Sequence, residues 1–490
     1  METAYEVIVI GSGPGGMACA VRLAKAGVRT LLVEKNNLLG GKMITVSRDG
    51  HRFDLWPHGQ VPMSGSAFET LFRELGVESE LHACLTPEDR RQVCSISYRA
   101  SGWKEFHTVT LAQAREDATP FFDLWGLAEE DRVKAMRFLT KMVMMPPEEV
   151  DALDDLTMHD FMSQHDVPYA LYSYLAFHSN ASLAEPVDRV AASEQVKIMQ
   201  QIAFQGGGGN YKGGFGHLID VLAREYRRWG GQVLTKAPVE RILVEEGRVA
   251  GVIADGQRFD AHVVVSSAGL QPTVLKLVGE EHFDPAYVRY VRGLQPGWGF
   301  TSGRYFLKKD VLKLPMYVVY SDDSWWNLER YQAVREGETP DEVILFAVVP
   351  SNYDPEMSPP GKQVLVAGTI CPPDPESREI EMLYRKMDEM IARLFPQAWE
   401  AVEHADYDGP REISSATRES VVPGAGGECV GLASMVGQCG KHKPSCRSPI
   451  PGLYYAGADA GSAGMGTHMA ADSGMKVSQM VLEHLRGADQ

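Results

Sequence analysis

The sequence predicts an α/β fold in which a parallel-sheet domain is interrupted by an inserted α+β domain. The first observation is an apolar, β-branched run at 7–10, followed by Gly-Ser-Gly-Pro-Gly-Gly at 11–16. The second is an acidic residue, Glu34, directly after another apolar run at 30–33. The third is a helix-rich pattern at 111–205 that separates this start from further glycine-rich segments. Together they predict a Rossmann-like domain that carries an insertion.

The glycine loop has the spacing G-x-G-x-x-G. Its first glycine permits a tight turn, its second lets the backbone approach a pyrophosphate, and its third lets the next helix pack on the strand. That helix, expected from about residue 15 to residue 26, directs N–H groups and partial positive charge toward the phosphate. The loop therefore predicts that a dinucleotide is bound by Gly11, Gly13, Pro14, Gly15 and Gly16.

Glu34 follows the first glycine at about the 20-residue interval of dinucleotide-binding domains. A carboxylate there accepts hydrogen bonds from ribose hydroxyls and repels a 2′-phosphate, which is compatible with NAD or FAD. Gly40-Gly41-Lys42 comes soon afterwards. This second glycine pair resembles the Gly-Gly motif of FAD-dependent amine oxidases and phytoene desaturases, in which it extends the site around the flavin. The resemblance favours FAD, bound in part by Glu34, Lys35, Gly41 and Lys42.

Composition limits the class of protein. The chain has 490 residues, which is enough for two or three domains, and 44% hydrophobic and 23% charged residues are ordinary values. A net charge of −17 argues against nucleic acid and against simple electrostatic binding to anionic lipid. With no secretory leader and no apolar run of about 18 residues, we expect a cytoplasmic protein. A Met-rich stretch at 141–147 leaves open a membrane-peripheral contact.

Cysteines and histidines give no metal signal. The seven cysteines are odd in number and scattered, and no C-x-x-C occurs, which predicts reduced thiols. His442 lies between Cys439 and Cys446, but that spacing matches no common zinc finger. We expect no metal. The histidines of the helical block also lack ligand spacing and are expected to be solvated or capping; these are His159, His165 and His178.

The nucleotide-binding pattern resumes after the helical block. A glycine-rich tract at 205–214 precedes a helix, a strand, Val239, a hairpin and a buried strand that ends at Ala268. This order resembles the FAD-dependent family of phytoene desaturases, carotenoid isomerases and retinol saturases, which belongs to the amine oxidase superfamily. The resemblance implies that the backbone at Val239 lies against the adenine. It also implies a divided chain, with FAD-binding parts at 1–110, 206–290 and 411–490 and substrate-domain parts at 111–205 and 291–410.

The end of the chain carries a third segment of the same resemblance. A short strand at 453–456 leads to Gly457 and Asp459, and Gly466-Thr467-His468-Met469 opens a long helix. The resemblance implies that Asp459 bonds ribityl or pyrophosphate oxygens and that the helix start lies beside the flavin pyrimidine edge. A helix N-terminus stabilises the negative charge of a reduced flavin. The expected contacts in this segment are Gly457, Asp459, Gly466, Thr467, His468 and Met469.

The family resemblance implies a flavin enzyme that moves hydride between flavin N5 and a carbon centre of a lipophilic alkene. Desaturation, saturation and redox isomerisation all use this step. Candidate proton-transfer groups are His468, Tyr211 and His58, with a capping or packing role as the alternative for His468. Electrons are expected to pass to or from oxygen, a quinone or a transient partner, since the sequence has no second strand–GxGxxG–helix motif that would hold a nicotinamide cofactor.

Alternatives remain open. An amine oxidase acting on C–N or C–O bonds has the same fold, and so does a non-catalytic prenyl-binding escort protein. Cys429 precedes the last strand at about the distance of the cysteine that holds flavin covalently in monoamine oxidases, but Val430 replaces the following aromatic residue. We therefore expect non-covalent FAD, with Cys429 as a buried or pocket thiol.

Overall fold

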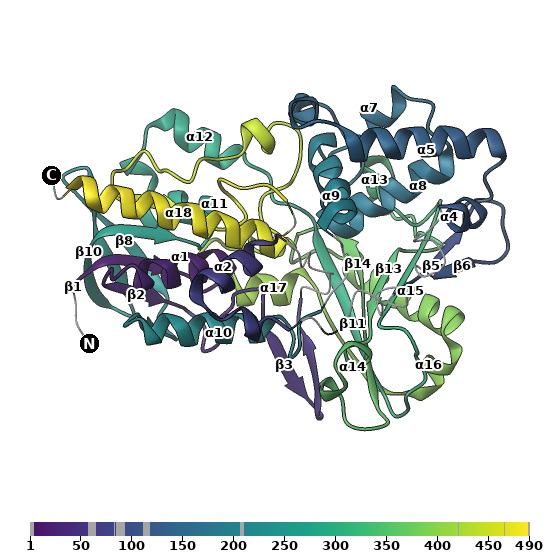
Figure 1. The fold of residues 1–490 in the computed structure, drawn as a ribbon, viewed down its shortest axis with the longest axis horizontal. Coiled ribbons are helices and arrows are strands. Elements are labelled where there is room, and N and C mark those ends of the chain that lie inside the picture. The colour runs from purple at the N-terminus through teal and green to yellow at the C-terminus, as the bar shows by residue number, and fades with distance from the viewer. Residues whose placement is uncertain are drawn as a thin grey trace.

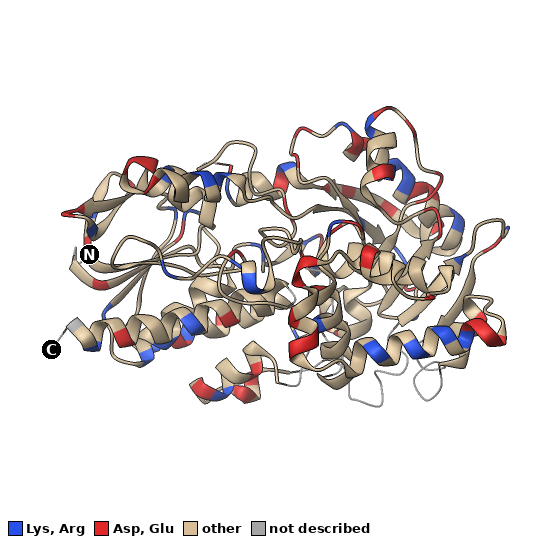
Figure 2. Ribbon diagram, turned by 90° about the horizontal axis from the view of Figure 1, so that it is seen from above, with Lys and Arg blue, Asp and Glu red and all other residues tan. Residues whose placement is uncertain are grey.

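The computed structural model describes residues 4–56, 65–82, 84, 94–110, 118–205, 210–419, 421–464 and 466–488. The chain forms two lobes, and both termini lie at the far end of the first one (Figure 1). The second lobe carries the helix-rich block and a separate sheet. Charged residues of both signs are interspersed along the outer helices, whereas the strands inside are mostly uncharged (Figure 2).

A mixed, seven-stranded sheet forms the centre of the first lobe. Its order is β7-β2-β1-β10-β9-β8, and β16 pairs with the end of β10. The pairs β7–β2, β2–β1, β1–β10 and β10–β16 are parallel. The hairpin of β8 and β9 adds the antiparallel pairs β10–β9 and β9–β8. The strands are β1 (Ala4–Ile10), β2 (Thr30–Val33), β7 (Gln232–Leu234), β8 (Val239–Glu245), β9 (Arg248–Ala254), β10 (Gln257–Ser266) and β16 (Leu453–Tyr455).

The predicted strand, loop, helix and strand at the start of the chain are confirmed. β1 pairs in parallel with both β2 and β10, with Ile8 opposite Leu31 and Val264. Residues 7–10 are buried, as an apolar strand covered on both faces requires. Helices pack over this sheet: α1 (Pro14–Lys25), α2 (Ala67–Leu75), α10 (Phe215–Arg228), α12 (Pro285–Gly293) and α18 (Gly466–Ala488).

The second lobe contains a seven-stranded, largely antiparallel sheet in the order β15-β11-β14-β13-β12-β5-β6. Only the β12–β5 pair is parallel among these described strands. The strands are β5 (Cys94–Arg99), β6 (His107–Thr110), β11 (Gly299–Leu307), β12 (Met316–Ser321), β13 (Leu345–Val348), β14 (Gln363–Cys371) and β15 (Val402–Asp408).

The predicted boundary at residue 110 needs correction. β5 pairs with β12 through Ile96 and Val318, so 94–110 belong to the second sheet and not to the nucleotide-binding part. The helices of this lobe share its apolar core. They are α4 (Thr119–Leu124), α5 (Glu129–Met144), α6 (Pro147–Asp151), α7 (Met158–Ser163), α8 (Tyr169–His178), α9 (Ala192–Gln205), α13 (Leu328–Arg335), α14 (Pro350–Tyr353), α15 (Glu379–Leu394) and α16 (Pro396–Ala401).

Two small elements join the lobes. The hairpin of β3 (Thr45–Arg48) and β4 (His51–Asp54) follows the second glycine pair, and α17 (Pro410–Ala416) follows β15. The side chain of Asp54 accepts hydrogen bonds from Thr45 Oγ1 at 2.6 Å and from the N–H of Phe215 at 2.9 Å. Burial raises the pKa of Asp54 to about 7 despite these two donors. The hairpin is therefore fixed to the start of α10.

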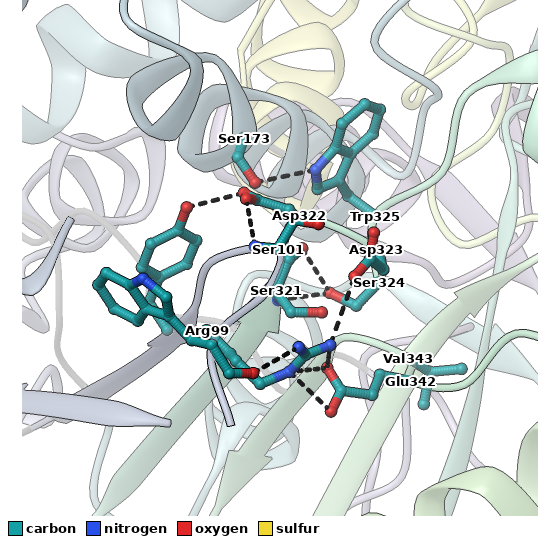
Figure 3. A network of polar contacts seen from close by, with 12 residues as sticks. Arg99, Ser101, Ser173, Ser321, Asp322, Asp323, Ser324, Trp325, Glu342 and Val343 are labelled. Atoms are coloured by element: carbon teal, nitrogen blue, oxygen red, sulfur yellow. Dashed lines mark hydrogen bonds and ion pairs between the residues drawn. The ribbon is translucent and has the colours of Figure 1, made fainter. Parts of the chain in front are cut away.

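A buried polar network ties β5 to the end of β12 (Figure 3). Asp322 accepts hydrogen bonds from the hydroxyl of Tyr98 at 2.7 Å and from the N–H of Ser101 at 2.8 Å. Arg99 contacts both carboxylate oxygens of Glu342 at 3.1 Å. Only 3% of the Glu342 side chain is exposed. A guanidinium that pairs with both oxygens of a buried carboxylate holds strand ends that are far apart in the sequence.

We predict that Glu342→Gln lowers the free energy of unfolding by about 3 kcal/mol, because both Arg99 and Arg393 lose this buried carboxylate as a charged partner. Glu389→Gln is the matched control, since Glu389 forms an exposed pair with Lys386. That control should cost less than about 0.5 kcal/mol. Urea denaturation of both variants measures the difference, and equal costs would contradict a stabilising role for this pair.

Candidate functional site

A cavity of about 970 Å³ lies between the two lobes and is lined by both sheets. We call the part lined by the first lobe and α17 the glycine end; it includes 10–15, 33–36, 237–240, 267–269, 416–418, 456–459 and 466–468. We call the part lined by the second sheet and by α8 the apolar end. Its residues include Cys94, Ile96, Tyr174, Phe177, His178, Ala181, Ser182, Phe300, Met316, Val318 and Phe346.

The glycine loop is held at the cavity by Glu34. One carboxylate oxygen accepts hydrogen bonds from the N–H of Ser12 at 3.0 Å and from its hydroxyl at 2.6 Å, and the other accepts from the N–H of Asn36 at 2.8 Å. The Ser12 hydroxyl oxygen in turn accepts from the N–H of Gly40 at 3.0 Å. One buried carboxylate thus connects the first glycine motif to the second.

The two ends of the chain meet where α1 packs against α18. A Cβ atom added to Gly15 would lie 2.7 Å from the Cα of Gly457, and one added to Gly474 would lie 2.0 Å from the carbonyl oxygen of Gly15. Both distances are shorter than any carbon side chain tolerates. Glycine at these positions therefore lets the helices approach closely enough for both first turns to reach one cavity.

A cluster of charged groups closes the glycine end. Arg418 pairs with Glu428 at 3.0 Å and with Asp459 at 3.2 Å, and Lys42 pairs with Glu428 at 3.3 Å. Asp459 also accepts hydrogen bonds from the N–H groups of Leu270 at 2.9 Å and of Leu432 at 3.1 Å. Burial alone would raise the pKa of Asp459, but Arg418 and these donors outweigh it and lower that pKa. The charged side chain of Asp459 thus holds together the chain segments at 270, 418 and 432.

His468 lies at the start of α18 and lines the cavity. It is 6% exposed, and neither ring nitrogen has a hydrogen-bond partner among the described residues. Phe68 packs edge-on against the ring, with 5.3 Å between centroids. Burial lowers the pKa of His468 to about 3, so the ring is neutral at physiological pH.

Most residues predicted to bind the cofactor line the cavity. They are Gly11, Gly13, Pro14, Gly15, Glu34, Lys35, Gly41, Lys42, Val239, Ala268, Gly457, Asp459, Gly466, Thr467 and His468.

Three residues differ from this pattern, and one cannot be placed. Gly16 and Met469 are buried behind the lining: a Cβ on Gly16 would lie 2.0 Å from the Gly11 carbonyl oxygen, and Met469 is 2% exposed. Tyr211 lines a separate cavity of about 20 Å³. The structure therefore places Tyr211 away from the large cavity, which argues against its predicted role in proton transfer. His58 lies outside the described residues.

Two groups at the cavity differ from the sequence-based expectation. Arg418 lies between glycine-rich segments, in no recognisable motif, and only its pairing with Asp459 reveals its place. His178 was expected to be solvated or capping, but it is 7% exposed and lines the apolar end. A helical pattern of apolar residues with a histidine cannot by itself distinguish a histidine that packs in a core from one that faces a cavity.

Among the described lining residues, the apolar end contains no Asp, Glu, Lys or Arg. The lining carboxylates are Glu34, Glu240 and Asp459, all in the glycine end. Cys429 also lines the cavity, and burial raises the pKa of its thiol. The arrangement suits a ligand with a polar, phosphate-bearing part at one end of the cavity and an apolar molecule at the other.

The sequence pattern of the family described as "Flavin containing amine oxidoreductase" matches residues 14–482. The chain belongs to this family. It is a flavoprotein oxidoreductase of the amine oxidase superfamily, as the resemblance implied. Within the described ranges, no helix has the length and apolar character needed to span a membrane.

Named relatives have modest identity over most of the chain. A phytoene desaturase of Phycomyces blakesleeanus is 23% identical, covering 84% of this chain and 74% of its own. The human all-trans-retinol 13,14-reductase is 25% identical, covering 94% of this chain and 83% of its own. The crystal structure of an oxidoreductase from Methanosarcina mazei superposes with a TM-score of 0.72 at 21% identity, covering 97% and 100% of the two chains.

We predict that flavin-free protein loses stability as the pH falls from 6.5 toward 3, partly through His468. The unfolded chain binds a proton at the usual histidine pKa of 6.5, whereas the folded chain binds it only near pH 3. His468→Asn should therefore reduce the slope of unfolding free energy against pH between pH 4 and 6 by about 1.4 kcal/mol per unit.

The matched control is His262→Asn, because His262 is exposed on β10. Urea unfolding over this pH range measures the slopes. Parallel curves for the wild type and His468→Asn would contradict the buried, neutral state of His468.

Proposed function

We propose that this chain binds FAD without a covalent bond and uses it to desaturate, saturate or isomerise a lipophilic, alkene-type substrate such as an isoprenoid. The observation that supports this is a cavity in which glycine loops from both ends of the chain face an apolar end whose described lining residues include no carboxylate. FAD, when bound, exchanges hydride with a carbon centre. The protein supplies binding, orientation and a dry surrounding.

The glycine end fits a dinucleotide. Apart from its chain neighbours, no described residue has a heavy atom within 4 Å of a Cβ built on Gly13, so a phosphate can approach the backbone there. The N-termini of α1 and α18 both reach the cavity, and each favours negative charge. The two ring nitrogens of His468 are buried and have no hydrogen-bond partner in the described part of the chain, so a ligand can supply one.

We propose a role in cofactor or substrate binding for each of three residues. Glu34 would accept hydrogen bonds from the ribose, as its position at the end of β2 suggests. His468, neutral and unpaired, would hydrogen-bond the flavin or a group beside it. Cys429 would contact FAD or substrate only as a thiol, because a raised pKa disfavours the thiolate that covalent attachment requires.

An amine substrate is less well supported. A protonated amine in the apolar end would have no carboxylate among the described lining residues, and an unpaired buried charge is costly. A planar alkene needs only apolar contact, which Phe177, Phe300 and Phe346 supply. The named relatives that act on retinol and phytoene agree with this choice.

The test is an anaerobic titration of the flavin in both redox states, with product analysis by chromatography. We expect an isoprenoid alkene to bleach oxidised flavin, to reoxidise reduced flavin or to be isomerised in one of the two states. Putrescine and benzylamine should do none of these. Bleaching by an amine while the isoprenoids stay unchanged would refute the proposed substrate class.

We predict that Gly13→Ala weakens FAD binding at least tenfold while the flavin-free protein keeps its melting temperature. Gly13 has φ −57° and ψ 169°, which alanine adopts without strain, so the added methyl group only occupies the space of the phosphate. Gly293→Ala is the control, since Gly293 also has no atom within 4 Å of an added Cβ and lies at the end of α12. Unchanged flavin retention in Gly13→Ala would contradict the phosphate site.

A further inference from the structure

The wall formed by α8 and the helical turn that follows it carries a row of polar groups into the apolar end. Tyr174, His178 and Ser182 recur every four residues, and all three line the cavity. Residues four apart lie on the same face of a helix. We call these three residues the polar stripe. They are unexpected there, because the strands opposite contribute mainly apolar side chains.

The backbone at the C-terminal end of the polar stripe is not a regular α-helix. α8 continues into a π-helical turn, η4 (Ser179–Leu183), which ends at Ala184 with φ +53°. A non-glycine residue in the left-handed region costs energy, and π-turns inside helices are frequent at functional sites. Asn180 stabilises the turn: its amide donates to the carbonyl of Glu185 at 2.8 Å, and its oxygen accepts from the N–H of Trp326 at 2.6 Å.

Gln195, on the neighbouring α9, fixes the orientation of the His178 ring. Its amide nitrogen donates to Nδ1 of His178 at 2.8 Å, while its amide oxygen accepts from the hydroxyl of Ser179 at 3.1 Å. Gln195 is fully buried. Burial lowers the pKa of His178 to about 4, so the ring is neutral. Because Nδ1 accepts a hydrogen bond, the single ring proton is on Nε2.

The Nε2–H group of His178 is poorly satisfied by the protein. Its hydrogen-bond contact among the described residues is the Ser182 hydroxyl at 3.4 Å, which is long for such a bond. Lysine, arginine and carboxylate side chains are absent from the described lining at this end. A buried donor without a good partner is destabilising, and a ligand oxygen that accepts its hydrogen bond recovers that loss.

We propose that His178 donates this Nε2–H hydrogen bond to an oxygen of the substrate, so the preferred ligand is a lipophilic alkene that carries a carbonyl or hydroxyl group and not a bare hydrocarbon. The inference rests on the proposed function, because it concerns the substrate of the same cavity. His178 is then a residue that determines specificity. Gln195 is a positioning residue that keeps the ring proton directed at the substrate.

The test compares two ligands with the same C15 skeleton: farnesal, which carries a carbonyl oxygen, and farnesene, which carries none. Binding to FAD-loaded protein is followed by the change in flavin absorbance or fluorescence. We expect wild type to bind farnesal about 10- to 100-fold more tightly than farnesene, which corresponds to one buried hydrogen bond. His178→Phe should bring this ratio close to one, mainly by weakening farnesal.

Two variants separate the hydrogen bond from other effects. His178→Gln keeps an N–H donor at a similar reach and should restore part of the preference for farnesal. His159→Phe makes the same change at an exposed histidine of α7 and should leave the ratio at its wild-type value. If His178→Phe fails to retain flavin, His178→Leu removes the donor with a smaller side chain and takes its place.

The outcomes distinguish this inference from the proposed function. Equal binding of the two ligands by wild type, or an unchanged ratio in His178→Phe, overturns the role of His178 while the cavity keeps its substrate class. If Tyr174→Phe abolishes the preference for farnesal over farnesene while His178→Phe keeps it, the role of His178 is also overturned. The tyrosine hydroxyl would then be the group that binds the substrate oxygen. Binding of neither ligand by wild type refutes the proposed function, and the inference falls with it.

Discussion

The close packing of α1 against α18 is the constraint on which the site depends. Gly15, Gly457 and Gly474 lack side chains where two helices from opposite ends of the chain meet, and a Cβ atom at either Gly15 or Gly474 would overlap backbone. This contact brings two helix N-termini to one cavity, each with unsatisfied N–H groups and partial positive charge. A single such terminus binds one phosphate group. Two that converge suit an elongated molecule with a phosphate at one end and an electron-rich ring at the other.

The second lobe gives the cavity a different character. Its sheet contributes apolar side chains from β5, β11, β12 and β13, and α8 adds the polar stripe. Charged groups are confined to the glycine end, where Arg418, Glu428 and Asp459 neutralise one another. The low-dielectric end strengthens any single hydrogen bond made there, which is why one histidine can influence ligand choice.

Local pattern allowed the nucleotide-binding part to be predicted. The run from β1 through Glu34 places its signals within 40 residues, and each element follows from apolar periodicity and glycine spacing. The affiliation of 94–110 was predicted wrongly, because the partner strand β12 lies more than 200 residues away and strand pairing over that distance leaves no local trace. His178 was misjudged for a related reason: its bond to Gln195 and its place in the cavity wall depend on how α8 packs against α9 and the second sheet, which the sequence pattern of α8 alone does not show. Tyr211 shows the converse error, since closeness to a glycine tract in sequence did not bring it to the site.

The order of the segments along the chain also affects how the protein matures. The cavity wall needs residues near 11 and near 468, so the ribosome must synthesise almost the whole polypeptide before the wall can close. Until then α1 lacks its packing partner α18, and the apolar surface that α18 covers stays available to chaperones or to misfolding. A nucleotide bound at this wall would therefore stabilise only chains in which both segments have been made and have met.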